Sequence, residues 1–81
     1  MKAHVYVTLK RTVLDAQGQT IADALRRMEY SGIADVRQGK YFVLTLDDGL
    51  EHNVAQAEVK RIAQDVLTNP VIEEFTFRLE D

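Results

Sequence analysis

The sequence has no cysteine, no tryptophan and only one proline, and none of its apolar runs is long enough to span a membrane. The absence of cysteine excludes disulfide bonds and thiolate metal ligands, and it fits a reducing compartment such as the cytoplasm. A membrane-spanning helix needs about 18 consecutive apolar residues. Because Met1 and Lys2 lead directly into a strand-like pattern, we expect a cytoplasmic protein with no secretion signal and no membrane contact.

An excess of positive charge is also missing. Thirteen acidic and ten basic side chains give a formal net charge of −3. A general nucleic-acid binder normally presents a basic face, because neutralising phosphates supplies most of its affinity. We therefore expect no nucleic-acid partner.

The length of 81 residues, with 46% hydrophobic and 28% charged residues, predicts a single folded domain over residues 1–81. A chain of this size buries only about 60–65% of the surface that its unfolded form exposes. Small domains often gain stability from disulfides, metal ions or self-association. Self-association is the option that this composition leaves open, so we expect a dimer or a higher oligomer.

Motifs for catalysis and cofactor binding are missing as well, since the glycines at positions 18, 32, 39 and 49 form no nucleotide-binding loop. Ser31, the only serine, has no nucleophile-elbow context. His4 and His52 fall in different predicted elements, so we interpret them as surface histidines rather than zinc ligands. Three acidic pairs lie at predicted turns and strand ends, where carboxylates are usually solvated: Asp47-Asp48, Glu73-Glu74 and Glu80-Asp81. We expect no catalytic residue, no metal and no cofactor.

The hydrophobic pattern alternates between strand and helix periods. Residues 3–10 alternate with period two, which predicts a strand with Val5 and Val7 facing the core. From Ile21 the apolar spacing becomes i, i+3, i+4, i+7, which predicts a helix capped by Asp15 or Thr20.

The second half of the chain repeats this alternation. A capping box at Asn53 predicts a second amphipathic helix, which ends at Asn69 and Pro70. Residues 71–79 predict a final strand, with Phe75 and Phe77 on one face.

The stretch between the two helices is too long for a straight strand. Residues 33–46 would span about 45 Å as one strand, whereas a domain of this length should be only about 30 Å across. The stretch must therefore bend, form a hairpin, or project into a neighbouring subunit, and Gln38-Gly39 is the natural break. The resulting order is β-α-β-α-β, or βαββαβ if the stretch is a hairpin. Either order predicts an α+β fold, an antiparallel sheet with two helices on one face.

The break in this stretch is the best candidate for a contact with another protein. Arg37 and Lys40 flank Gly39, and Tyr41 follows. Arginine and tyrosine are enriched at protein interfaces, and both cations could stay hydrated at a projecting turn until a partner arrives. A merely solvated turn is the alternative. Base stacking by Tyr6, Tyr41 and Phe42 is a weaker possibility, because Phe42 shares its strand face with Leu44 and Leu46, which favours core packing.

Several stretches resemble the PurS family, the small subunit of bacterial and archaeal formylglycinamide ribonucleotide amidotransferase. In the family's order they are Val7-Thr8-Leu9-Lys10, Val13-Leu14-Asp15-Ala16-Gln17-Gly18, Ile21-Ala22-Asp23-Ala24-Leu25, Asp35-Val36-Arg37-Gln38-Gly39-Lys40 and Leu67-Thr68-Asn69-Pro70-Val71-Ile72-Glu73. They span residues 5–79. Ala16 departs from the family, which usually has proline there, a residue that suits the first turn of a helix. The candidate partner-binding residues within these stretches are Asp15, Gln17, Arg37, Gly39 and Lys40.

The resemblance implies a non-catalytic subunit of phosphoribosylformylglycinamidine synthase, an ATP-dependent C–N ligase. Such subunits self-associate and bridge a PurQ-type glutaminase and a PurL-type synthetase. The complex converts formylglycinamide ribonucleotide, ATP and glutamine to formylglycinamidine ribonucleotide in purine biosynthesis, and the small subunit supports ammonia transfer. Two rival classes stay open on the residues alone: a ligand-sensing module of βαββαβ layout and a nucleic-acid-binding domain.

The isolated chain is expected to have no enzymatic activity, since nucleophile, metal and phosphate motifs are all missing. Glutaminase and ATPase assays of the purified protein should show no turnover above buffer. Turnover that keeps pace with the amount of this protein through successive purification steps would contradict the prediction.

Overall fold

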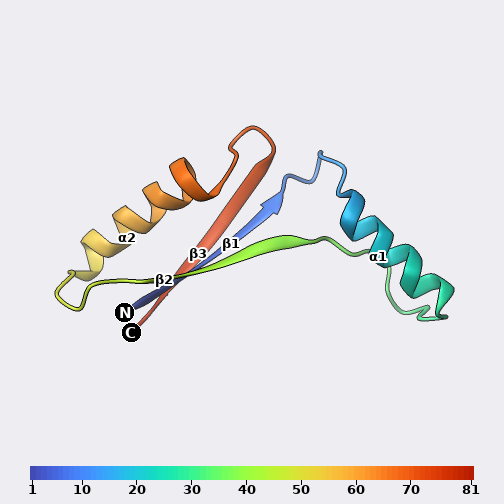
Figure 1. Ribbon diagram of the computed structural model, residues 1–81, viewed down its shortest axis with the longest axis horizontal. Coiled ribbons are helices and arrows are strands. Elements are labelled where there is room, and N and C mark those ends of the chain that lie inside the picture. The colour runs from blue at the N-terminus through green and yellow to red at the C-terminus, as the bar shows by residue number, and fades with distance from the viewer.

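The computed structural model describes residues 1–81 as an antiparallel three-stranded sheet with two helices (Figure 1). Strand β1 is central in the order β2-β1-β3, and it pairs antiparallel with both neighbours. The elements are β1 (Lys2–Leu9), α1 (Ala16–Arg27), β2 (Gly39–Thr45), α2 (His52–Ile62), a π-helical turn (Ala63–Leu67) and β3 (Glu73–Glu80). The predicted α+β class and the antiparallel sheet are confirmed.

The core lies between β1 and α2. Ala3, Val5 and Val7 alternate along β1 and are fully buried, as the period-two pattern predicts. They pack with Val59 and Ala63, which share one face of α2 and its continuation. Apolar residues of the sheet, of the residue after β2 and of the π-helical turn surround this cluster but are only partly buried: Phe42, Leu44, Leu46, Leu67, Phe75, Phe77 and Leu79.

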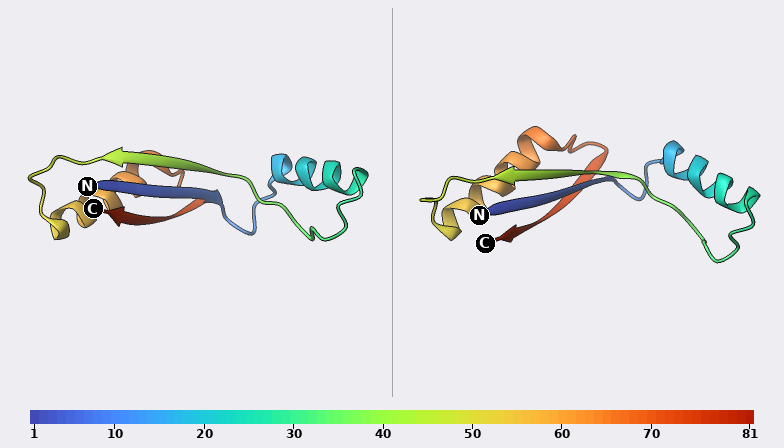
Figure 2. Two further views of the ribbon diagram at one scale, coloured as in Figure 1. Left: turned by 90° about the horizontal axis from the view of Figure 1, so that it is seen from below. Right: turned by 60° about the horizontal axis from the view of Figure 1, so that its bottom comes forward.

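Helix α1 does not cover the sheet, so the expectation of two helices on one face is wrong within a single chain. It lies beyond the end of the sheet at one extreme of the long axis (Figures 1 and 2). The molecule measures 51 × 27 × 13 Å, with a radius of gyration of 16.2 Å, against about 12 Å for a compact domain of this length. Helix α1 is instead bonded to the segment between itself and β2, where Arg26 donates to the Ala34 carbonyl. Periodicity predicts which face of a helix is apolar but not which surface that face meets.

The long middle stretch projects instead of folding into a hairpin. Residues 33–38 have no strand partner, and β2 begins at Gly39, the predicted break. The order is therefore β-α-β-α-β. A Cβ on Gly39 would lie 2.5 Å from the Val7 carbonyl oxygen, so glycine allows the close approach of β2 to β1.

Only one of the predicted helix caps is present. Asp15 caps α1, whereas the Thr20 hydroxyl donates to the Ala16 carbonyl inside the helix. The capping box at Asn53 is absent, because α2 begins at His52 and its cap position, Glu51, makes no side-chain hydrogen bond.

Replacing Gly39 with alanine should destabilise the fold, because the new methyl group would lie 2.5 Å from the Val7 carbonyl oxygen, a backbone atom, and 2.8 Å from the Thr8 side-chain methyl group. We expect Gly39→Ala to lower the free energy of unfolding by about 1–3 kcal/mol, which a thermal melt would register as several degrees or more. Gly49→Ala is the matched control, since nothing lies within 4 Å of its added methyl group. An equal melting temperature for the two variants would contradict the predicted backbone clash.

Candidate functional site

Asp15 joins the start of α1 to the start of β2. Its side chain is almost buried, with 6% of the residue exposed. One carboxylate oxygen accepts from the Gly18 N–H at 2.9 Å, and the other accepts from the Gln38 N–H at 2.6 Å. These bonds, the one from Gln38 first, hold the pKa of the Asp15 carboxyl below its ordinary value. Gly18 must be small here, because a Cβ would lie 2.4 Å from an Asp15 carboxylate oxygen.

Arg37 also connects the segment before β2 to the end of β1. Its Nη2 donates to the carbonyls of Leu9, Lys10 and Val13 at 3.4, 3.2 and 3.3 Å, all in the end of β1 and the loop that follows. The expected projecting turn with hydrated cations is therefore wrong for Arg37. The guanidinium is still exposed, and its fork-shaped donors suit several acceptors at once.

Lys40 is paired as well, but on the β3 side. Its Nζ lies 3.3 Å from a Glu73 carboxylate oxygen, and 61% of the lysine side chain is exposed against 11% for Glu73. The other Glu73 oxygen accepts from the Asn69 N–H at 2.8 Å. This backbone bond, followed by the lysine, keeps the pKa of Glu73 below its ordinary value.

Sequence reasoning missed Glu73, which it had placed in a solvated acidic pair with Glu74. Antiparallel pairing sets Glu73 opposite Leu9 at the end of the sheet, with Glu74 exposed. Period-two alternation places Glu73 on the same face of β3 as Phe75 and Phe77, and Glu74 on the exposed face. This alternation is the signal that could have distinguished the two carboxylates.

Four of the five candidate residues line one hollow at the end of the sheet. The hollow has a volume of ≈ 200 Å³, and its lining includes Asp15, Gln17, Gly39 and Lys40, together with Gln38 and Glu73. The Gln38 side chain donates to the Gln17 side-chain oxygen at 2.5 Å. Arg37 lines a neighbouring hollow of ≈ 340 Å³ with Arg11 and Asp35.

The two hollows are lined by one exposed lysine, Lys40, and two exposed arginines, Arg11 and Arg37. No group of three or more histidine, aspartate or glutamate side chains converges in a way that could hold a metal ion. The arrangement suits a contact with another protein surface, with Lys40 and Arg37 as the charged groups.

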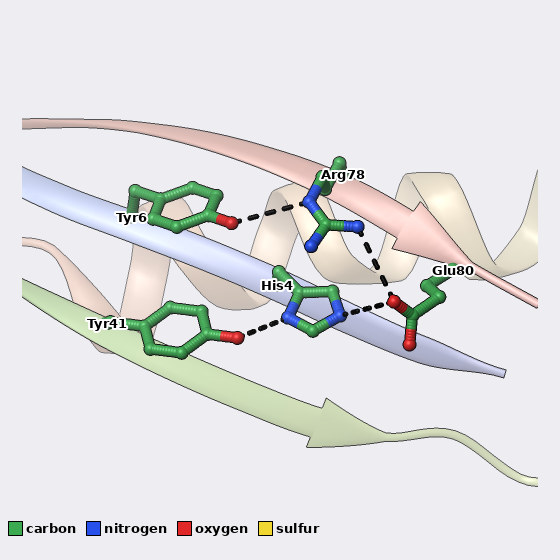
Figure 3. Close-up of polar contacts among 5 residues, drawn as sticks. All are labelled: His4, Tyr6, Tyr41, Arg78 and Glu80. Carbon is green, nitrogen blue, oxygen red and sulfur yellow. Dashed lines mark hydrogen bonds and ion pairs between the residues drawn. The ribbon is translucent and has the colours of Figure 1, made fainter.

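The face of the sheet opposite α2 carries a second polar cluster, which the sequence did not reveal (Figure 3). His4 is only 7% exposed, so its interpretation as a surface histidine is wrong. Its Nδ1 lies 2.5 Å from the Tyr41 hydroxyl, and its Nε2 lies 3.5 Å from Glu80. Arg78 joins the cluster by donating to the Tyr6 hydroxyl at 3.3 Å.

This cluster depends on pairing between strands that are distant in the sequence. Tyr6 lies opposite Tyr41, and the two rings stack with centroids 5.2 Å apart. This stacking adds a side-chain contact between β1 and β2.

None of the helices has the length and apolar composition that crossing a bilayer requires.

Comparison with known proteins identifies relatives along the whole chain. A family model described as PurS, phosphoribosylformylglycinamidine (FGAM) synthase, matches residues 2–81. The chain is 47% identical over 79 residues to the phosphoribosylformylglycinamidine synthase subunit PurS of Mycobacterium leprae, covering 98% of this chain and 95% of the relative.

Two solved structures extend this similarity to the fold. PurS of Methanocaldococcus jannaschii, a subunit of formylglycinamide ribonucleotide amidotransferase, is similar with a TM-score of 0.87 and 28% identity, covering 99% of this chain and 95% of that one. A chain in the structure of PurLQS from Thermotoga maritima is similar with a TM-score of 0.81 and 28% identity, covering 95% and 93%.

Replacing Asp15 with asparagine tests the junction. The amide can still accept from Gly18, but its NH₂ group would face the Gln38 N–H, so one hydrogen bond is lost and two donors oppose each other. We expect a melting temperature several degrees lower at pH 7. Asp48→Asn, in an exposed turn, should change little.

The decrease in melting temperature caused by Asp15→Asn should also depend on pH. The lowered pKa means that ionised Asp15 stabilises the fold above the unfolded-state value of about 3.9, and this stabilisation disappears as the pH falls through the folded-state pKa. Melts of wild type and Asp15→Asn should therefore converge in strongly acidic buffer. A difference in melting temperature that stays constant down to pH 2 would argue against stabilisation by the ionised Asp15 carboxylate.

Proposed function

The chain belongs to the PurS family, and on that basis we propose that it is the small, non-catalytic subunit of phosphoribosylformylglycinamidine synthase in purine biosynthesis. In this role it bridges a PurL-type synthetase subunit and a PurQ-type glutaminase subunit and supports the transfer of ammonia between them. The complex uses ATP and glutamine to convert formylglycinamide ribonucleotide to formylglycinamidine ribonucleotide. We also propose a cytoplasmic location, which the cysteine-free sequence supports.

One observation carries this proposal: the chain is similar over 95% of its length to a chain in the PurLQS structure. A match that covers nearly all of both chains supports a like role for the whole of residues 1–81, acting as one domain. The site described above supports that role, since the exposed side chains of Arg37 and Lys40 lie beside backbone that is fixed by hydrogen bonds.

We propose that Gln17, Arg37, Gly39 and Lys40 contact the larger subunits. All four are exposed, and they lie at one end of the sheet. Asp15 acts differently, because both of its oxygens are occupied by backbone N–H groups. We assign it to holding the contact residues in place.

Neutralising the two cations should weaken assembly without unfolding the subunit. We expect the double variant Arg37→Gln, Lys40→Gln to lower reconstituted amidotransferase activity several-fold when this subunit is limiting. Activity should return as the concentration of the variant subunit is raised. The physical reason is that charges at an interface govern encounter and register. Activity would be measured with PurL-type and PurQ-type subunits from the same source.

Lys60→Gln is the matched control, since Lys60 is an exposed cation on α2 away from both hollows. The melting temperature of each variant shows whether lost activity reflects lost folding. Full activity of the double variant would refute the contact role, and failure of the wild-type chain to restore activity would refute the proposed function itself.

We also propose that the chain self-associates, which its extended shape and small core support. Light scattering coupled to size exclusion at micromolar concentration should give at least twice the monomer mass of 9.2 kDa. A monomer at that concentration would count against self-association.

A further inference from the structure

A hollow on the face of the sheet opposite α2 gathers charges of both signs. We call it the outer hollow. It is the hollow of ≈ 340 Å³ already described, and it is lined by Thr8, Leu9, Arg11, Asp35, Arg37 and Glu74. Its walls come from the end of β1 and the loop that follows, from the segment before β2 and from the start of β3. The proposed subunit contact uses Arg37 but leaves the other charged groups of this hollow unexplained.

Strand alternation places one wall of the outer hollow on the face that α2 does not cover. Thr8 and Glu74 are paired directly opposite each other on β1 and β3. Their neighbours Val7 and Phe75 belong to the core or pack against it. Because successive side chains of a strand point to opposite faces, Thr8 and Glu74 point away from the core, and both are exposed. This wall therefore presents a hydroxyl group beside a carboxylate.

The guanidinium group of Arg37 is held in place at the outer hollow. Its Nη2 donates to the carbonyls of Leu9, Lys10 and Val13. A guanidinium has five N–H donors in a planar fork, so these bonds leave Nε and Nη1 available to another acceptor. A cation that is already positioned loses less side-chain freedom when an acceptor binds.

The charges of the outer hollow are balanced and are not paired with each other. The ion pairs of the chain all join other residues. The two arginines and the two carboxylates of the lining cancel in formal charge. This balance argues against a phosphate or a nucleotide, because several negative charges would meet Asp35 and Glu74 as well as the arginines. It favours a small ligand that carries one charge of each sign.

We propose that the outer hollow binds a free α-amino acid in its zwitterionic form. The α-carboxylate accepts hydrogen bonds from Arg11 and Arg37, whose planar groups match the two oxygens of a carboxylate. The α-ammonium group donates to Asp35 and Glu74, and the Thr8 hydroxyl is a further polar partner. The volume of ≈ 340 Å³ lies at the lower end of the range of about 300–1,000 Å³ that is typical of small-molecule sites. This inference goes beyond the proposed function.

The affinity of such a site should be modest. All four charged side chains are exposed, and exposed ion pairs contribute little because water screens them. We therefore expect a dissociation constant in the millimolar range. Because Arg37 also belongs to the proposed contact with the larger subunits, amino-acid binding and assembly would be linked, and each would change the affinity of the other by the same factor.

Chemical-shift titration of the isolated, ¹⁵N-labelled chain tests the site without the larger subunits. The probes are L-glutamine, which carries both charges and an uncharged side chain, propionate, ethylamine and inorganic phosphate. Glutamine should shift the amide signals of Arg11, Asp35 and Arg37 and reach saturation. Propionate and ethylamine each carry one of the two charges, so each should bind about five-fold or more weakly than glutamine.

Two substitutions remove one charge of each sign from the outer hollow. Arg11→Gln and Asp35→Asn should each weaken glutamine binding about five-fold. Asp35→Asn should not weaken the binding of propionate, which has no ammonium group to lose a partner. Arg61→Gln is the matched control, since Arg61 is exposed on α2 and lines a different hollow. All three sites are exposed, so the melting temperatures should match that of the wild type.

Several outcomes would overturn the amino-acid site. The absence of saturable shifts with glutamine would do so, as would tighter binding of phosphate than of glutamine. Equal affinities for glutamine and propionate would show that the carboxylates take no part. If Asp35→Asn weakened binding of a PurL-type subunit while glutamine gave no shifts, the hollow would be part of a protein contact instead. None of these results decides the proposed function, which is tested separately by reconstituted activity.

Discussion

The carboxylate of Asp15 sets the shape of this molecule. It accepts hydrogen bonds from two backbone N–H groups that lie 20 positions apart, at Gly18 and Gln38. One bond starts α1, and the other ties that start to the segment entering β2. The three carbonyls held by Arg37 brace the same corner. Because these bonds fix the start of α1 against the segment entering β2, α1 points away from the sheet. The molecule is therefore elongated, measuring 51 × 27 × 13 Å.

The projection of α1 leaves a thin core. Of 81 residues, only 11 are buried, and the fully buried side chains of the core are alanine and valine. The larger apolar side chains surround that core without being enclosed, since one helix cannot cover three strands. Burying apolar surface contributes about 25 cal/mol per Å². The partly covered phenylalanines and leucines are therefore the largest reserve of stabilisation that association could use.

The α1 end of the sheet and the sheet face opposite α2 have different chemical character. At the α1 end, Lys40 and Arg37 remain exposed although each is anchored, so their charges are available on a rigid support. On the face opposite α2, polar and aromatic side chains satisfy one another, with His4 enclosed between Tyr41 and Glu80 (Figure 3). The chain belongs to a family whose curated members are named as subunits of phosphoribosylformylglycinamidine synthase.

The sequence by itself determined the elements, the family and the inward face of β1. Strand and helix periods depend on neighbouring residues, and Asp15 was among the two caps that local spacing allowed. The sequence also indicated four of the five candidate residues that line one hollow in the structure. Only the tertiary structure decided where α1 lies, that Glu73 pairs with Lys40, and that His4 is enclosed. Each of these depends on strand register or on a hydrogen bond between distant positions, and a pattern of apolar residues does not encode which surface meets which.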